Sequence, residues 1–370
     1  MRRSSLFSIL LILALGACLD RINIDTGSIS TFPVVIDGFI SDQPGPYTIL
    51  VTKAFDIESK TSIKAPISVK KLTVSDDHGT SEVLSETSQG VYNTSSSGIR
   101  GTLGRAYKIK VELLDGRVYE SNPDTLLAAG KVDTVYYNFK EGQDTKGATT
   151  YGFDVFFNAS AGSKRNFHFL WKFTGTYEVD TNPELHSEPC GEGTCPKPPS
   201  CSGYAVQSGS VIQVGSCTCC KCWSSLYNGE PIVSDNQFVQ GGHFQSVQAI
   251  YIPLDPWIFQ HKVHAQVTQL SLTEQSFAFW KGIKAQKSAG TSLFQPLTGK
   301  IISNFVQISG SEAPIEGAFF ASSISTNSIF ITRAAVPNTV PIPSPGIPFK
   351  DNCLHLFPGS TVNKPAYWGF

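Results

Sequence analysis

Charge is scarce in this sequence. Asp, Glu, Lys and Arg make up 16% of its 370 residues, and the formal net charge is -1 at pH 7. A protein that holds nucleic acid by its phosphates needs a basic surplus, and steering of strongly anionic partners needs one too. We therefore expect no nucleic-acid partner, and the overall charge gives no case for a strongly anionic one.

Recognisable catalytic motifs are also missing. The sequence holds no G-x-S-x-G elbow, no glycine-rich phosphate loop leading into a helix and no EF-hand loop. His261 and His264 would point to opposite faces of a strand, and no glutamate completes a zinc-protease pattern. We expect no catalytic residue, no metal and no cofactor. Paired carboxylates for glycoside hydrolysis would need closeness in space that sequence does not reveal, so a hydrolase stays as the least favoured alternative.

Long apolar runs are confined to the start of the chain. Arg2 and Arg3 precede an apolar stretch over residues 6–15 that only Ser8 interrupts. A membrane-spanning helix needs about 20 apolar residues, so this stretch is too short to span and has the form of a secretory signal. No second segment suited to a membrane follows it in the sequence.

Cys18 gives this signal a sharper interpretation. The run Leu15-Gly16-Ala17-Cys18 resembles the bacterial lipobox, whose cysteine receives a diacylglyceryl group and becomes the new N-terminus. We predict a lipoprotein signal peptide over residues 1–17, lipidation of Cys18 and a tether over residues 18–32. Two or three acyl chains anchor durably, at about 0.8 kcal/mol per buried methylene. The alternative is an ordinary signal peptide in which Cys18 is incidental.

Eight further cysteines fit an exported protein. An even number in an oxidising compartment indicates disulfides, although sequence does not choose the pairing. Seven fall in one window and the eighth lies far along the chain: Cys190, Cys195, Cys201, Cys217, Cys219, Cys220, Cys222 and Cys353. Full pairing forces one window cysteine to reach Cys353, so the window should pack against the C-terminal tail. Adjacent Cys219 and Cys220 should not bond to each other, because the peptide between them would be strained.

Metal binding and redox chemistry are the alternatives for this window. Cys217, Cys219, Cys220 and Cys222 overlay C-x-C and C-x-x-C spacings, which suit zinc or copper(I). An exported chain meets oxidants before it meets buffered metal, so disulfides are favoured over both alternatives. The glycines and prolines around the window predict irregular backbone.

Strand patterns dominate the first domain. Short runs rich in Val, Ile and Tyr are separated by turn residues, and Tyr107, Ile109 and Val111 alternate with charged residues. An Asp-Gly pair at 115–116 is then a hairpin signal. We predict a mainly β protein in which residues 33–125 form an immunoglobulin-like β-sandwich.

A larger β-rich domain is predicted over residues 131–370, cross-linked by a cysteine-rich insert at 186–223. Phe167, Phe169 and Trp171 alternate with other residues along one strand, which indicates a sandwich core.

One docked helix is expected in this second domain. Ser271 or Thr273 can cap this helix, and Ser271 and Glu274 have capping-box spacing. Aromatic residues follow at helical spacing, so the helix should run from about 273 to 287. Strand-like segments at 296–333 are expected to complete the second sheet. A Pro-rich C-terminal tail ends the chain.

Motifs spread along the chain carry a resemblance to a family. The sequence resembles the Bacteroidota outer-membrane lipoproteins grouped as the domain of unknown function 4249 family. The matching features are the lipobox at Cys18, Gly38 in the opening strands, Gly90-Val91-Tyr92, residues 115–121, Cys222-Trp223, the helix at 271–280, residues 296–301 with 321–323, and Cys353 with Lys364-Pro365-Ala366-Tyr367-Trp368.

The resemblance implies a role and no reaction. Similar proteins are often encoded beside TonB-dependent outer-membrane receptors, which implies a non-enzymatic accessory lipoprotein in uptake or envelope assembly. Its expected partner is such a receptor or another envelope protein, and its expected location is the cell outer membrane. Whether it faces the periplasm or the surface is left open. A surface lipoprotein that binds glycan or peptide is the alternative.

Overall fold

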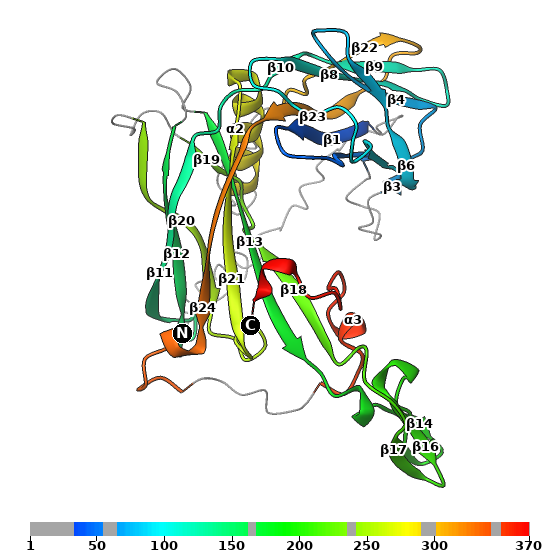
Figure 1. Ribbon diagram of the computed structural model, residues 1–370, viewed down its shortest axis with the longest axis vertical. Helices are drawn as coiled ribbons and strands as arrows, with labels where there is room; N and C mark the ends of the chain where they lie inside the picture. The colour runs from blue at the N-terminus through cyan, green and yellow to red at the C-terminus, as the bar shows by residue number, and fades with distance from the viewer. Residues whose placement is uncertain are drawn as a thin grey trace, which may run out of the picture.

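The structure is a computed structural model that describes residues 33–54, 65–161, 168–234, 242–289, 301–341 and 349–369. It is mainly β, as the sequence predicts, with two β-sandwich bodies and a cysteine-rich projection (Figure 1). The predicted signal peptide, Cys18 and the tether lie outside the described residues. None of the described helices is long and apolar enough to cross a membrane.

The first body is a sandwich of two sheets. One sheet runs in the order β23 (Ile315–Ser322), β1 (Val34–Ser41), β2 (Thr48–Lys53), β7 (Val91–Asn93) and β6 (Ser85–Ser88), with β3 (Ala65–Pro66) on β2. The other runs β22 (Phe305–Ser309), β9 (Val118–Ser121), β8 (Ala106–Glu112), β4 (Lys71–Asp76) and β5 (Ser81–Val83), with β10 (Asp124–Thr125) on β8. Tyr107, Ile109 and Val111 on β8 are fully buried in the shared core, as their alternation predicts.

Two strands of this sandwich come from late in the chain. β23 pairs in parallel with β1, with Val34 opposite Ile315, and β22 pairs with β9. The prediction that residues 296–333 complete the second sheet is therefore wrong for β22 and β23. Strand patterning identifies an apolar face but carries no information about its partner, since either sandwich would bury that face.

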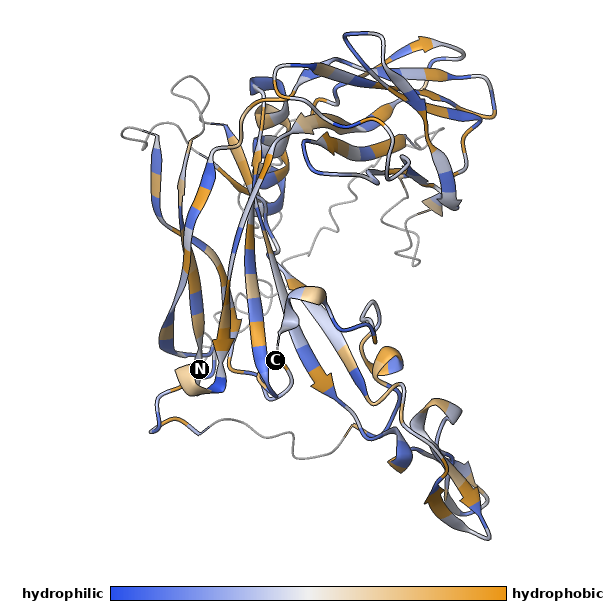
Figure 2. Ribbon diagram, in the orientation of Figure 1, coloured by the Kyte–Doolittle hydropathy of each residue, from blue (hydrophilic) through white to orange (hydrophobic). Residues whose placement is uncertain are grey.

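The second body also packs two sheets face to face. One contains β11 (Lys131–Gln143), β12 (Thr149–Ser160) and β20 (His243–Pro253). The other contains β18 (Lys221–Tyr227), β13 (Phe169–Asp180), β21 (Lys262–Ser271) and β24 (Ile324–Thr332), with β19 (Ile232–Val233) on β13. Phe169, Trp171 and Phe173 lie in the core between them, and Figure 2 shows the alternation of apolar and polar residues along these strands.

The cysteine-rich insert forms two small hairpins, β14 (Ser187–Cys190) with β15 (Gly193–Pro196) and β16 (Tyr204–Gln207) with β17 (Ser210–Gln213). The expectation of irregular backbone is therefore wrong for these segments. The short 3-10 helices η1 (Pro183–Leu185) and η2 (Ser200–Ser202) lie beside the hairpins in the sequence. All eight cysteines form disulfides, Cys190–Cys195, Cys201–Cys219, Cys217–Cys220 and Cys222–Cys353. Adjacent Cys219 and Cys220 do not bond to each other, as expected.

The docked helix is α2 (Glu274–Ala289), close to its predicted bounds. Its Phe277 and Trp280 pack on a buried apolar cluster that contains Leu170 and Leu270 of the second body and Phe320 of β23. The helix therefore lies at the junction of the two bodies, whereas the sequence analysis predicted that it docks on the second body alone. The remaining short helices are η4 (Arg333–Ala335), α3 (Cys353–Leu356) and η5 (Ala366–Trp368).

A buried carboxylate ties this junction together. Asp124 is 2% exposed and accepts hydrogen bonds from the hydroxyls of Thr273 and Ser276 at the start of α2. It also accepts one from the Ala321 N–H on β23, at 2.9 Å. Burial raises the pKa of the Asp124 carboxyl above its usual value, because the charged form is poorly solvated there.

We expect Asp124→Asn to remove a pH-dependent part of the free energy of unfolding. A carboxyl whose pKa is raised by folding stabilises the fold at low pH, and this contribution is lost as pH rises from the unfolded value, about 4. The melting temperature of the Asn variant relative to the parent should therefore rise between pH 4 and pH 7. Asp124→Ala should be destabilised across that range by about 2 kcal/mol, since it leaves buried donors unpaired. An Asn-to-parent difference that stays constant with pH would contradict this account.

Candidate functional site

A hollow lies where the C-terminal tail crosses the second body. It has a volume of about 610 Å³ and is lined by β13, β18, the residues that begin β21, the end of β24 and the tail. We call it the tail pocket. Its lining residues include Glu178, Lys221, Trp223, Lys262, Arg333, Lys364 and Trp368.

The tail is fastened to β18 beside the pocket. Cys222 bonds to Cys353, and both are fully buried in a small apolar cluster with Val179. The next residue, Trp223, exchanges backbone hydrogen bonds with Thr361 of the tail, at 2.8 and 3.1 Å. These contacts hold in place the tail residues that form one wall of the pocket.

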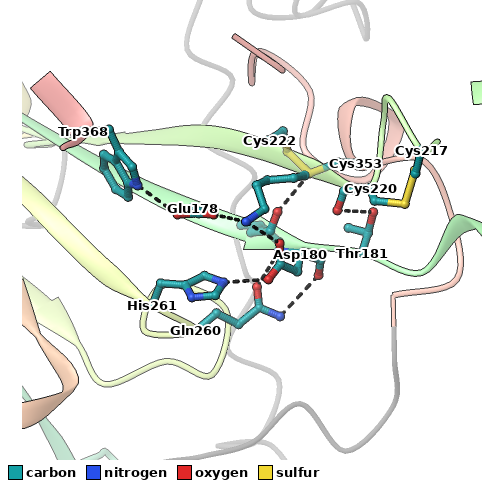
Figure 3. A network of polar contacts seen from close by, with 12 residues as sticks. Glu178, Asp180, Thr181, Cys217, Cys220, Cys222, Gln260, His261, Cys353 and Trp368 are labelled. Atoms are coloured by element: carbon teal, nitrogen blue, oxygen red, sulfur yellow. Dashed lines mark hydrogen bonds and ion pairs between the residues drawn. A yellow bond between two sulfur atoms is a disulfide. The ribbon is translucent and has the colours of Figure 1, made fainter. Parts of the chain in front are cut away.

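Glu178 is the carboxylate on the pocket wall. Its side chain accepts hydrogen bonds from the Lys221 ammonium and, at 2.8 Å, from the indole N–H of Trp368 (Figure 3). Burial alone would raise the pKa of this carboxyl, but these two donors hold the pKa below its usual value. The same hydrogen bond raises the pKa of Lys221. Glu178 is therefore ionised at neutral pH, and its charge is already balanced by Lys221.

Two further cations of the pocket, Lys262 and Arg333, contact neutral groups. Lys262 donates to the Trp368 carbonyl at 2.9 Å, and its ammonium lies 4.4 Å from the centre of the Phe330 ring. Arg333 donates through Nη1 to the carbonyls of Phe259 and Gln260, at 3.0 and 3.2 Å. Within the described residues, these contacts fix both side chains without an acidic partner.

Three residues beside the pocket have the spacing of a metal site. One ligand atom from each of Glu178, Asp180 and His261 lies within 4.8 Å of the others. Lys221, however, contacts both carboxylates, with its ammonium 3.4 Å from Asp180 Oδ1, and His261 Nε2 lies 2.7 Å from Asp180 Oδ2 (Figure 3). A metal ion would have to displace the Lys221 ammonium, so the group is best described as an ion-pair network.

The two histidines singled out from the sequence have separate environments. His261 contacts Asp180 beside the tail pocket. His264 is 4% exposed and stacks on Tyr367, with ring centres 4.2 Å apart. Burial, with the nearby Lys262 charge, lowers the pKa of His264, which keeps its ring neutral at pH 7. The structure joins Cys222, which precedes the pocket residue Trp223, to Cys353 of the tail. The other six cysteines pair within the insert and its return to β18.

Sequence reasoning missed the cations of the tail pocket. Lys221, Lys262, Arg333 and Lys364 come from four separate segments, and none of them belongs to a motif. The prediction that the cysteine window packs against the tail was the one signal that pointed here. It is confirmed by the Cys222–Cys353 bond.

Fold and disulfides define the class of protein: a mainly β chain of two sandwiches with a disulfide-linked tail. The family model described as Domain of unknown function (DUF4249) matches residues 20–328, and the chain belongs to this family. A comparison with curated proteins finds no match. The family match ends before Arg333, Lys364 and Trp368, so part of the tail pocket lies beyond the matched residues.

Proposed function

We propose that this protein is a lipid-anchored, non-enzymatic lipoprotein of the outer membrane that binds a partner in the envelope. Its proposed partner is a TonB-dependent receptor, and its proposed role is accessory to uptake or envelope assembly. The tail pocket is the observation that carries the binding role, because Lys262 and Arg333, whose partners within the described residues are carbonyl oxygens and aromatic rings, present ordered charge at a hollow. The anchor rests on the lipobox at Cys18, and four disulfides fit an exported protein.

Lipidation is tested by Cys18→Ser, which removes the thiol that would carry the acyl chains. The parent should fractionate with membranes and yield an acylated N-terminal peptide that begins at Cys18. The variant should lose at least about tenfold of its membrane-bound fraction, because acyl burial supplies the anchoring energy. Gentle detergent extraction of the parent should also recover an outer-membrane barrel with it.

The matched control is Cys190→Ala with Cys195→Ala, which removes two cysteines of the insert and leaves Cys18 in place. This control should stay with the membranes. If Cys18→Ser also stays there and the parent yields no acylated peptide, the anchor is excluded.

A further inference from the structure

A second hollow lies between α2 and the first body. Its volume is about 330 Å³, and its walls come from α2, from the first residues of β1 and β23, and from Ile301. The helix contributes Trp280 together with Phe279, Ile283 and Gln286. The last three are spaced by four and then three residues, so they lie on one side of the helix. We call this site the junction hollow.

The strand wall of the junction hollow carries two carboxylates. β1 and β23 pair in parallel with Val35 opposite Glu316, so these two side chains share one face of the sheet. Asp37 follows Val35 by two residues and shares the same face. Val34 and Ile36 alternate with them and are fully buried in the core of the first body. The face with the two carboxylates is therefore the one that borders the hollow.

The apolar lining of the junction hollow is accessible to a ligand. Each of its large apolar residues is partly exposed, namely Val35, Phe279, Trp280, Ile283 and Ile301. A ligand that covers apolar surface gains about 25 cal/mol per Å² removed from water. The volume of about 330 Å³ lies at the lower end of the range for small-ligand sites, about 300–1,000 Å³. The hollow therefore suits a molecule with one ring and a short side chain.

The charge at the junction hollow selects among such ligands. Its described lining residues include Asp37 and Glu316 and no basic residue. Asp37 interacts electrostatically with Lys172, whose ammonium lies 5.8 Å from the centre of the Trp280 ring. The Glu316 side chain makes no hydrogen bond or ion pair with any residue that the structure describes. A neutral ligand would remove water from this carboxylate without replacing it, and an anion would be repelled, whereas an ammonium group would pair with it.

We propose that the junction hollow binds a small aromatic amine, with its ring between α2 and the strand wall and its ammonium group at Glu316. This proposal goes beyond the proposed function, because it adds a ligand site that needs neither the lipid anchor nor an envelope partner.

The test is isothermal titration of the detergent-solubilised full chain with 2-phenylethylamine at low salt, with the heat of the detergent buffer subtracted. A ligand of this size with one ion pair predicts a Kd on the order of 0.1–1 mM. 2-Phenylethanol, which has a hydroxyl in place of the ammonium, should bind at least about fivefold more weakly, and 3-phenylpropionate more weakly still. Added salt should weaken binding of the amine.

Two variants separate the charge from the apolar wall. Glu316→Gln should weaken the amine about fivefold and leave the alcohol unchanged, because it removes only the charge. Ile283→Ala should weaken the amine and the alcohol alike, about threefold, because it removes part of the apolar wall. Glu312→Gln is the matched control, since Glu312 is an exposed carboxylate just before β23 that does not line the hollow, and it should leave binding unchanged.

Melting temperatures check that each variant folds, and Glu316 and Ile283 test the same site independently. Three results would overturn the proposal. They are no binding of the amine to the parent protein, equal affinity for the amine and the alcohol, or unchanged binding of the amine in both folded variants. None of these bears on Cys18 lipidation or on recovery of a receptor, so the two proposals fail separately.

Discussion

Replacing Cys222 and Cys353 together with alanine is expected to lower the free energy of unfolding of the second body by about 5 kcal/mol. The bond closes a loop with a sequence separation of 131 residues, and the chain-entropy model gives about 5 kcal/mol for a loop of that size. Both residues are fully buried against Val179, so alanine fits the site without introducing a polar group. Urea denaturation of oxidised parent and variant measures the change.

Cys190→Ala with Cys195→Ala is the control for this loss. That bond joins residues only five apart in a hairpin with exposed strands, and the same model gives about 2 kcal/mol. The long bond should also protect the tail, so limited proteolysis should cut the Cys222/Cys353 variant near residues 349–369 and spare the control. Equal losses in the two variants, with an intact tail in both, would show that the long disulfide does not fasten the tail.

Replacing Gln269 with leucine is expected to destabilise the second body by about 4 kcal/mol. Gln269 is fully buried, accepts a hydrogen bond from the Trp171 indole N–H at 2.7 Å, and donates to the carbonyls of Ala129 and Ser160. Leucine would leave one buried donor and two carbonyls unpaired, at about 1–3 kcal/mol each. The measured quantity is again the free energy of unfolding in urea.

Gln266→Leu is the control on the same strand. Gln266 is only partly buried, and its side chain donates a long hydrogen bond of 3.5 Å to the Thr268 hydroxyl, so we expect the free energy of unfolding to change by no more than about 0.5 kcal/mol. Because Ala129 precedes β11 and Ser160 ends β12, Gln269 joins the first strand pair of this body to its second sheet. Similar effects of the two leucine substitutions would show that the Gln269 network contributes little.

Local patterns predicted the parts of the fold that local physics decides. The alternation through Tyr107, Ile109 and Val111 identified a buried strand face. The start of α2 was also predicted, but the residue that caps it is Thr273, whose Oγ1 accepts the Ser276 N–H at 3.4 Å, and not Ser271, which ends β21. Counting cysteines predicted that one of seven must reach Cys353, and the structure identifies it as Cys222. The first two inferences depend only on residues close together in the sequence. The third depends on the odd number of cysteines in the window, which cannot all pair with one another in any fold.

Such local patterns could not predict which segments far apart in the sequence pair or lie together in the fold. β23 pairs with β1 although more than 270 residues separate Ile315 from Val34. The sequence pattern of an apolar strand is the same whichever of the two sandwiches buries it, so the pattern does not identify the partner strand. The tail pocket was not predicted from the sequence for a related reason. The net charge of -1 averages over the whole chain, whereas the fold gathers Lys262 and Arg333 at one place.

Crosslinking mass spectrometry on intact envelopes tests the central claim, that this is an anchored protein bound to an envelope partner. Lysines at the pocket end of the second body, such as Lys221, whose side chain is 48% exposed, should give crosslinks to an outer-membrane β-barrel receptor. These crosslinks should fall in the Cys222→Ala, Cys353→Ala variant, in which the pocket wall is released. Recovery of the protein as an isolated species, with crosslinks only within its own chain, would contradict the account.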